Sequence, residues 1–189
     1  MTLEVVNYGH PALRQRGERI PAITPQIREL AENMLETMYD ARGVGLAAQQ
    51  VGRALQITVL DVREVTDRPS TLQIGGQTVT VADHMPLVLI NPEVTPTSEP
   101  VTGPEGCLSF PEMYADITRP GTVRVKALNL KGETMEFDCG GLLAKAVQHE
   151  VDHLQGILFI DRMARKDRDA LKPDLDELQA KTKAALAKK

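Results

Sequence analysis

Apolar residues recur at the spacing of an amphipathic helix in two stretches of the chain. The first begins at Thr24 and Pro25, which suit an N-cap and a first helical position, and the pattern predicts a helix that runs to about Asp40. The second stretch covers residues 142–155 and is followed by Gly156, the residue type that most readily adopts a left-handed C-cap. Both helices are expected to lay one face against an apolar core.

Shorter apolar runs outside these helices predict β-strands. Residues 55–62 and 87–94 are rich in Val, Ile and Leu, although the alternation in the first run is only partial. Residues 123–127 and 134–137 are separated by a turn that contains glycine, which predicts an antiparallel pair. The polar stretch 63–85 predicts a surface excursion or a hairpin outside the core.

The chain becomes highly charged after Asp161. Pro173 is expected to interrupt this region, and residues 174–187 resume a helical pattern with acidic residues early and lysines late, as the helix dipole favours. We therefore expect a peripheral charged helix within about 161–189. The length of 189 residues and the lack of repeats or linkers predict a single domain over 1–189.

Composition places the chain among soluble globular proteins. Apolar residues make up 42% and charged residues 25%, far from the values of disordered or membrane proteins. The formal net charge of −4 gives no reason to expect DNA or other nucleic acid as a substrate. The N-terminus lacks a signal-peptide pattern and no run approaches about 20 apolar residues, so we expect a cytoplasmic protein without a membrane partner.

The second predicted helix carries an H-E-x-x-H motif at residues 149–153. At about 100° per residue, His149, Glu150 and His153 fall on the same half of the helix as its apolar residues. The opposite half holds Lys145, Gln148, Asp152 and Gln155. Polar groups on an apolar face are costly to bury without partners, and a metal ion would supply the compensation. The alternative is a hydrogen-bonded core network that binds no metal.

A hydrolytic metal site usually has three protein ligands and one open position, so a third ligand is needed. A zincin-type peptidase would take this ligand from downstream, where the candidates are Asp161, Asp167 and Asp169. Those aspartates lie in a charged, solvent-like segment. Cys107 is the better candidate, because Gly106 beside it allows close backbone approach. Cys139 is expected to be a small buried thiol, and His10 and His84 to be surface or capping residues.

Three segments resemble, in order, the three signature motifs of the bacterial-type peptide deformylases. They are residues 43–50 (GVGLAAQQ), 105–109 (EGCLS) and 148–153 (QHEVDH), and residues 9–14 resemble the family's N-terminal segment. The resemblance implies an α+β fold, with antiparallel sheets packed around a central helix that bears H-E-x-x-H and with further helices N-terminal and C-terminal to it. It also implies a metal-dependent hydrolase that removes the formyl group from N-formylmethionine of newly synthesised proteins and releases formate.

The resemblance implies roles for individual residues. The metal ligands would be Cys107, His149 and His153, with Glu150 as general acid/base. Gln50 and the backbone N–H of Leu108 would cradle the formyl oxygen, where donors act on charge that develops during the reaction. The substrate backbone would lie as an extended strand against Gly43, Val44, Gly45 and Gly106. Tyr114 stands where several members carry an arginine near the peptide groove, which leaves the preference beyond methionine open.

The chemistry of such a site follows from a divalent ion. The ion lowers the pKa of its bound water toward neutrality, and the resulting hydroxide attacks the formyl carbon while Glu150 handles the protons. A thiolate with two imidazoles suits Fe²⁺, Zn²⁺, Ni²⁺ and Co²⁺ alike. The resemblance implies Fe²⁺ in the cell.

Two other functions compete with this one. A zincin-like metallopeptidase would need only H-E-x-x-H, and a non-catalytic relative would bind metal or a nascent chain without turnover. Such a relative is expected to lack Glu150 or Gln50, and both are present. The expected partners are N-formylmethionyl nascent peptides. The charged C-terminal helix is expected to present a solvated face, and contact with the ribosome is the alternative that the resemblance implies.

Overall fold

The computed structural model describes residues 1–189. Its α-helices are α1 (Pro25–Asp40), α2 (Gly141–Leu154) and α3 (Arg165–Leu186). Short 3-10 helices are η1 (Pro11–Arg14), η2 (Ala48–Val51), η3 (Val81–His84) and η4 (Phe159–Asp161). The strands are β1 (Gly45–Ala47), β2 (Ile57–Leu60), β3 (Ser70–Ile74), β4 (Gln77–Thr78), β5 (Leu87–Pro96), β6 (Pro100–Cys107), β7 (Phe110–Pro120), β8 (Thr122–Leu128) and β9 (Thr134–Gly140).

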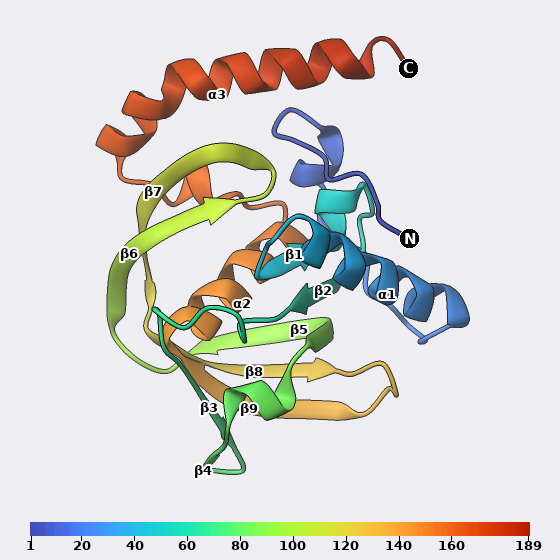
Figure 1. Cartoon of the computed structure of the whole chain (residues 1–189), viewed down its shortest axis with the longest axis vertical. Helices are drawn as coiled ribbons and strands as arrows, with labels where there is room; N and C mark the ends of the chain where they lie inside the picture. Colours follow the sequence, from blue (N-terminus) through green and yellow to red (C-terminus); the bar gives the residue numbers. More distant parts are fainter.

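Two antiparallel sheets enclose α2 (Figure 1). The larger sheet has seven strands in the order β1-β2-β5-β8-β9-β3-β4, and the smaller is the pair β6 and β7. In Figure 1 the long, curved β6–β7 pair lies on one side of α2 and the larger sheet on the other, while α3 lies beyond β7. This arrangement confirms the expected α+β fold with antiparallel sheets around the helix that carries H-E-x-x-H.

Three clusters of buried apolar side chains hold these layers together. The largest lies between α2 and the seven-stranded sheet and includes Leu143 and Leu72. A second cluster packs α1 against β1 and β2 around Met34, and a third joins β7, η4 and α3 around Phe110 and Phe159. Each fully buried Leu, Met or Phe contributes about 1.5–3 kcal/mol. The packing therefore fixes the rotation of α2 and the direction in which its polar residues point.

Both predicted helices that precede the C-terminal region are present. α1 has the predicted bounds, and the Thr24 hydroxyl accepts the backbone N–H of Ile27 at 3.3 Å. α2 is followed by Gly156 with φ +74°, the left-handed conformation that the sequence predicts. A Cβ at Gly156 would lie 2.7 Å from the carbonyl oxygen of Arg14. Glycine is therefore needed at this position for its φ and for close packing of the N-terminal segment.

Four predicted strands are present as β2, β5, β8 and β9. The 63–85 stretch forms the hairpin β3–β4, which turns at Gly75 and Gly76, both with positive φ. β3 pairs with β9 and extends the large sheet. Leu72 of β3 is 1% exposed, so the expectation that this stretch lies outside the core is wrong for β3.

Three strands were not predicted from the sequence: β1, β6 and β7. The segment 43–50 reads as a glycine-rich turn, but residues 45–47 pair with β2 and form the end of the large sheet. Prolines at positions 100, 104, 111 and 120 argue against strands in β6 and β7. In a two-stranded sheet every strand has a free edge, where the missing proline N–H interrupts no ladder.

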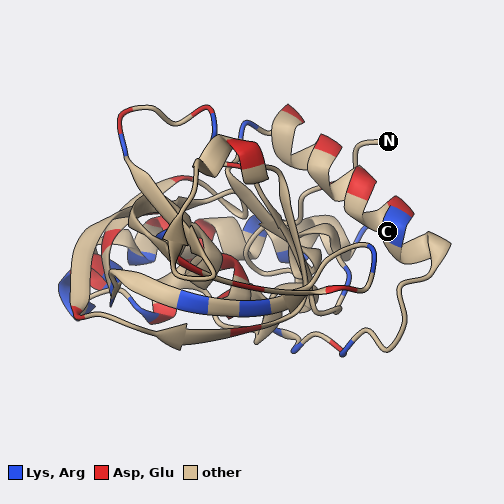
Figure 2. Ribbon diagram, turned by 90° about the horizontal axis from the view of Figure 1, so that it is seen from below, with Lys and Arg blue, Asp and Glu red and all other residues tan.

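The C-terminal helix α3 is continuous through Pro173, so the predicted interruption is wrong. Leu171, Leu175 and Leu178 pack on the third core cluster from both sides of the proline, and this packing offsets the lost hydrogen bond. Leu175 is the only buried residue of the helix. Acidic residues recur along the other long surface helix, α1 (Figure 2). None of the helices combines the length and hydropathy required to span a bilayer.

Candidate active site

α2 turns its two histidines and Glu150 toward the interior, as the helical spacing predicts. His149 is 7% exposed, Glu150 4% and His153 1%. They share this side of the helix with the buried Leu142 and Ala146. The opposite half is partly covered rather than open to solvent, since Lys145, Gln148, Asp152 and Gln155 are all half-buried.

Cys107 approaches the histidines from the end of β6. Its Sγ lies 3.3 Å from Nε2 of His153. One potential ligand atom from each of Cys107, His149 and His153 lies within 4.8 Å of the other two. A tetrahedral ion with ordinary metal–sulfur and metal–nitrogen distances separates two such donors by roughly 3.6 Å. The donor types and their spacing therefore fit one ion.

The other candidate ligands lie away from this cluster. Cys139 is buried in β9, and burial raises the pKa of its thiol to about 12. Asp161 forms an ion pair with Arg14 at 2.5 Å. The remaining candidates are Asp167 and Asp169 on α3, His84 at the exposed end of η3, and His10, which caps η1. The cluster of potential ligands thus contains Cys107 and none of the downstream aspartates that a zincin would use.

A buried ion-pair network joins α2 to the β6–β7 pair. Glu105 of β6 accepts hydrogen bonds from His149 Nδ1 at 3.0 Å and from Arg119 Nε at 2.6 Å. Arg119 of β7 is 3% exposed and also donates to Asp152 of α2 at 2.8 Å. Because a carboxylate only accepts, Nδ1 of His149 carries a hydrogen, and Nε2 is the nitrogen available to a metal.

The charge of Glu105 is held by this network. Burial alone would raise the pKa of Glu105, but the hydrogen bonds from His149 and Arg119 outweigh burial and lower it to about 2. Sequence reasoning missed Glu105, Arg119 and Asp152 as residues of the site. Glu105 lies two positions before Cys107 and could have been found as a partner for a ligand. Arg119 carries no such signal, because a charged residue in a strand is normally solvated.

Glu150 lies against the glycine-rich segment that forms β1. A Cβ at Gly45 would be 2.6 Å from Oε1 and 2.8 Å from Cγ of Glu150, so only glycine leaves room for this side chain. The second carboxylate oxygen, Oε2, is buried without a hydrogen-bond partner. Burial raises the pKa of Glu150 to about 7, a value suited to moving protons near neutral pH.

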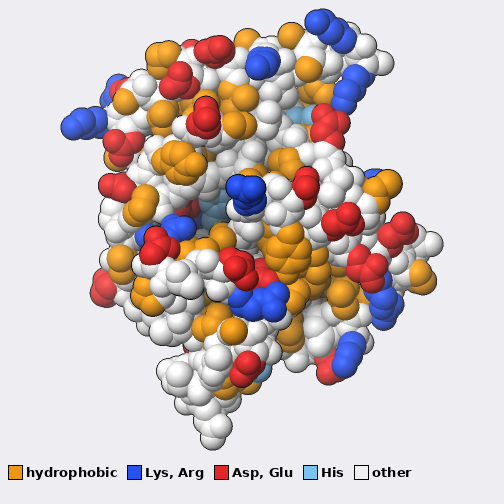
Figure 3. All heavy atoms as spheres, viewed as in Figure 1, with side chains coloured by type: hydrophobic (Ala, Val, Ile, Leu, Met, Phe, Trp, Pro, Cys, Tyr) orange, Lys and Arg blue, Asp and Glu red, His pale blue; other side chains and the backbone are white.

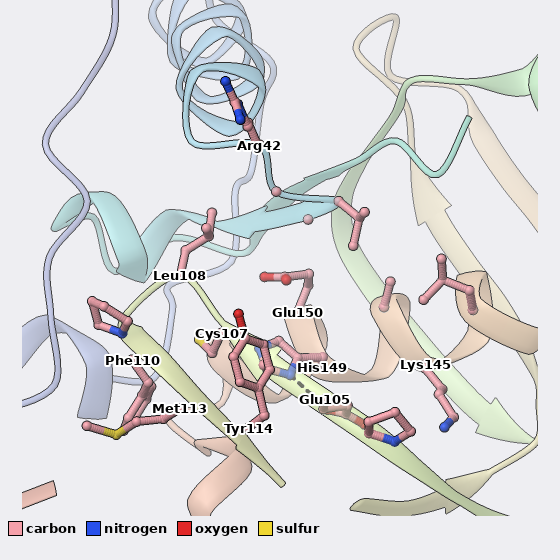
Figure 4. A pocket seen from close by; sticks show the side chains of 18 of the residues that line it. Arg42, Glu105, Cys107, Leu108, Phe110, Met113, Tyr114, Lys145, His149 and Glu150 are labelled. Carbon is pink, nitrogen blue, oxygen red and sulfur yellow. Dashed lines mark hydrogen bonds and ion pairs between the residues drawn. The ribbon is translucent and has the colours of Figure 1, made fainter. Parts of the chain in front are cut away.

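Gln50 and the 107–110 turn place hydrogen-bond donors beside the thiol. Oε1 of Gln50 accepts a backbone N–H of β1 at 2.9 Å, which directs Nε2 toward Cys107 Sγ at 3.6 Å and Ser109 Oγ at 3.3 Å. The backbone N–H of Leu108 has no protein acceptor. Figure 4 shows Leu108, Cys107 and Glu150 around the same cavity. The arrangement offers two N–H donors to a group bound there.

A cleft of about 390 Å³ is lined by Cys107, Leu108, His149 and Glu150, whereas Gln50 and His153 are not among its lining residues. Its volume is typical of ligand sites. Figure 3 shows a histidine at the floor of this hollow, with Lys and Arg side chains on its rim. Val44, Leu142 and Ala146 supply an apolar wall. Tyr114 is 70% exposed, and its ring covers Gly106, where a Cβ would lie 2.7 Å from the ring. The cleft thus brings together Gly43, Val44, Gly45, Gly106 and Tyr114.

The chain is similar to known proteins along most of its length. The family model of the polypeptide deformylases matches residues 2–169. The peptide deformylase of Opitutus terrae is 43% identical over 187 residues, which cover 98% of this chain and 97% of the relative. That of Methylacidiphilum infernorum is 44% identical over 179 residues, with coverage of 95% and 94%.

Solved structures show the same likeness. The peptide deformylase of Synechococcus elongatus in complex with actinonin matches with a TM-score of 0.78 and 37% identity, over 91% of this chain and 87% of that one. The Thermus thermophilus peptide deformylase matches with a TM-score of 0.81 and 33% identity, over 96% and 99%. By the extent of these matches in sequence and in structure, the chain belongs to the peptide deformylase family.

Proposed function

We propose that Cys107, His149 and His153 hold one divalent metal ion and that Glu150 moves the protons when this enzyme removes the formyl group from formylmethionine. Removal of that group from newly synthesised proteins, with release of formate, is the activity of the family. The proposal is carried by one observation: a thiol and two imidazoles come together beside a cleft that is also lined by an unpartnered buried carboxylate.

The donor set narrows the choice of metal only in part. When bound, a divalent ion supplies a Lewis acid that polarises the formyl oxygen and lowers the pKa of water. A thiolate with two imidazoles accepts Fe²⁺, Zn²⁺, Ni²⁺ or Co²⁺. We take Fe²⁺ as the native ion, in keeping with the family resemblance. Metal analysis and activity measured together on an anaerobic preparation test this choice, and full activity with Zn²⁺ alone would contradict it.

Glu150 carries the proton between the two halves of the reaction. It accepts a proton from the attacking water as the new C–O bond forms, and it delivers that proton to the amine nitrogen as the C–N bond breaks. A pKa near 7 supports both steps at neutral pH. Contact with Gly45 keeps the carboxylate directed into the cleft.

Gln50 and Leu108 stabilise the charge that develops on the formyl oxygen. The Gln50 amide is 1% exposed and is held through its own carbonyl oxygen, so its N–H₂ group needs no reorganisation. The Leu108 N–H is free to donate. Donors arranged in advance at such a position typically contribute on the order of 100-fold or more in rate each.

The substrate backbone adds to the free edge of β1. β1 is the end strand of the large sheet, so one of its edges carries unpaired backbone groups. A peptide beside residues 43–45 would gain main-chain hydrogen bonds in an extended form, with Gly106 and Tyr114 on its other side. Val44, Leu142 and Ala146 form an apolar wall for the methionine side chain.

Formate release from a formyl-Met peptide by the Fe²⁺- or Ni²⁺-loaded protein tests this function. Glu150→Gln preserves the side-chain volume and should keep the metal while losing about 10²–10⁴ in rate. Cys107→Ala should lose the metal. A loaded wild type that releases no formate, or a Cys107→Ala protein that binds metal as tightly as wild type, would contradict the proposal.

Ligand binding gives a second test, independent of turnover. The relative from Synechococcus elongatus was solved in complex with actinonin, and we propose that actinonin occupies the same cleft in this chain. A ligand that binds only the folded state at about 100 times its Kd stabilises it by about 2.7 kcal/mol. An unchanged melting temperature in the metal-loaded protein would argue against a shared binding mode.

We also propose that formylated nascent chains reach the enzyme at the ribosome, with α3 as the contact. Four lysines lie near its C-terminal end, at positions 181, 183, 188 and 189. Reversal of Lys181 and Lys183 to Glu should reduce cosedimentation with ribosomes in low salt. Equal cosedimentation of the variant and the wild type would contradict the ribosome contact. The lysines of α3 would then be solvent-exposed residues without a partner role, as the sequence predicts.

A further inference from the structure

The mouth of the cleft carries three basic side chains from separate parts of the chain. Arg42 follows α1, Arg68 lies in the loop between β2 and β3, and Lys145 lies on α2, and all three line the cleft. None of the three takes part in an ion pair in the structure. Figure 4 places Arg42 and Lys145 on different sides of the cavity. Through Arg68, the polar loop 61–69 forms part of the lining of the cleft.

Lys145 is held at this position by the shape of β6. A Cβ at Gly103 would lie 2.1 Å from Nζ of Lys145, so the ammonium group occupies space that any other residue at position 103 would fill. Lys145 is half-buried. A half-buried ammonium group without a carboxylate partner is a strong attractor for an anionic group of a ligand.

Acidic residues of the cleft do not neutralise these cations. Three glutamates line it, but Glu105 is paired with Arg119 and Glu150 lies on the floor beside Gly45. Only Glu112, which is exposed on β7, remains at the mouth. The lining therefore holds three cationic side chains and one exposed carboxylate outside the floor, although the whole chain has a net charge of −4. The cleft mouth is therefore positively charged in a chain of negative net charge, which points to a role for these cations in binding an anionic ligand.

The direction of the substrate places its downstream residues at this mouth. The formyl group must lie near Cys107 and Glu150 on the floor, so the chain leaves toward the rim. An extended peptide advances about 3.4 Å per residue. Residues two to four of the nascent protein are then the ones that pass the cationic rim.

We propose that Arg42, Arg68 and Lys145 select formylated chains with aspartate or glutamate among the residues that follow formylmethionine. This inference rests on the proposed function, since it assumes that a formyl-Met peptide occupies the cleft. Charge complementarity at a cleft mouth acts mainly on the rate of productive encounter, and so on kcat/KM. Each exposed ion pair between the enzyme and an acidic substrate residue is expected to change kcat/KM about 1.5- to 5-fold. Two such pairs should favour a substrate with two acidic residues by roughly 2- to 25-fold over one with two basic residues.

The test uses three formyl-Met peptides of equal length with amidated C-termini. Positions two and three carry Ala-Ala, Asp-Glu or Lys-Arg, and kcat/KM is measured for the metal-loaded enzyme. The expected order is acidic, neutral, basic. The acidic-to-basic ratio should fall toward one in about 1 M salt, where the Debye length is about 3 Å. Equal values for the three peptides, or a ratio that salt leaves unchanged, would overturn the inference.

Charge-reversed variants distinguish the rim from the general charge of the protein. Arg68→Glu should lower the acidic-to-basic ratio by about 3-fold or more, because one attraction becomes a repulsion. Lys131→Glu makes the same change of net charge in the exposed β8–β9 turn outside the cleft, and it should leave the ratio as in wild type. If Arg68→Glu lowers the melting temperature, Arg68→Gln and Lys145→Gln test the same prediction.

The failure of this inference is separable from the failure of the proposed function. If no peptide releases formate, the proposed function is wrong. If all three release it equally, or if Arg68→Glu and Lys131→Glu give the same ratio, only the role of the rim is wrong.

Discussion

Gly45→Ala separates two explanations for the glycine at the start of β1. The family resemblance makes Gly45 a contact for the substrate backbone, whereas the structure shows that its missing side chain leaves room for Glu150. A Cβ at position 45 would lie 2.6 Å from Oε1 and 2.8 Å from Cγ of Glu150. Because Glu150 is 4% exposed, little space is left into which it could move.

The size of the effect follows from these distances. Ordinary contacts of a Cβ lie at 3.4–4 Å, so the Glu150 side chain must retreat by about 1 Å. A displacement of that size can cost on the order of 100-fold in rate, which corresponds to about 2.7 kcal/mol in the activation free energy. The three atoms nearest to the new methyl group all belong to Glu150 and none to a proposed metal ligand. We therefore expect kcat to fall about 100-fold with metal content and melting temperature close to wild type.

Steady-state formate release, with metal content measured on the same sample, decides between the two explanations. A displaced Glu150 lowers kcat, whereas a blocked backbone contact raises KM and leaves kcat nearly intact. A kcat within about 3-fold of wild type in the fully loaded variant would refute the steric reasoning, because it is far from the loss expected for a 1 Å displacement.

Glu150→Asp provides the matched background for this experiment. The shorter side chain withdraws its Cγ and carboxylate from position 45, so Gly45→Ala should cost less in the Glu150→Asp protein than in wild type. Contacting residues typically show a coupling of about 0.5–3 kcal/mol in such a cycle. If the two substitutions lower kcat by independent factors, the new methyl group at position 45 and the side chain at position 150 are not in contact.

Three further predictions concern the surroundings of the site. Glu105→Gln removes the charge that orients His149, and we expect chelator competition to show about 10- to 100-fold weaker metal binding; unchanged affinity would contradict this. Cys139, whose pKa burial raises to about 12, should resist thiol reagents at pH 8 until the protein is unfolded; rapid labelling of the native protein would be the opposing result. At Asp161, burial acts to raise the carboxyl pKa, but the hydrogen bond from Arg14 outweighs it and holds the pKa below its usual range. The Arg14–Asp161 ion pair therefore adds to the free energy of unfolding at pH values above the unfolded-state pKa of about 3.9. This stabilisation is lost as the pH falls through the lower pKa of the folded state. Asp161→Asn should lower the melting temperature by roughly 1–2 °C at pH 7, an effect typical of an exposed pair, and by less near pH 3; an equal difference at both pH values would contradict this reasoning.

The parts of the fold that depend on local signals could be predicted from the sequence. α1 has the predicted bounds because its Thr24 cap and apolar spacing lie within a few turns of each other. The inward placement of His149, Glu150 and His153 follows from the same spacing in α2. Helical periodicity depends only on the residues of one short segment, so it predicts which side chains point inward without reference to distant parts of the chain.

The parts that depend on distant partners could not be predicted in this way. β6 and β7 contain prolines that count against strands, and only their pairing with each other makes these prolines tolerable. Arg119 is recognisable as a buried residue only when Glu105 and Asp152 are seen beside it. The three cations of the cleft likewise lie 26 and 77 positions apart in the chain, so no linear sequence motif indicates that they line the same cleft.

The same ion-pair network explains how the proposed metal ligands, which come from two separate elements, are kept in register. Cys107 belongs to the end of β6, whereas His149 and His153 belong to α2, and no covalent neighbour links the two. Arg119 bridges Glu105 of β6 to Asp152 of α2, and Glu105 in turn binds His149. Removing one partner of a buried ion pair typically costs about 3–5 kcal/mol. The protein's own contacts therefore set the distance between the thiol and the imidazoles, so under the proposed function a metal ion would join a site that the fold has already assembled.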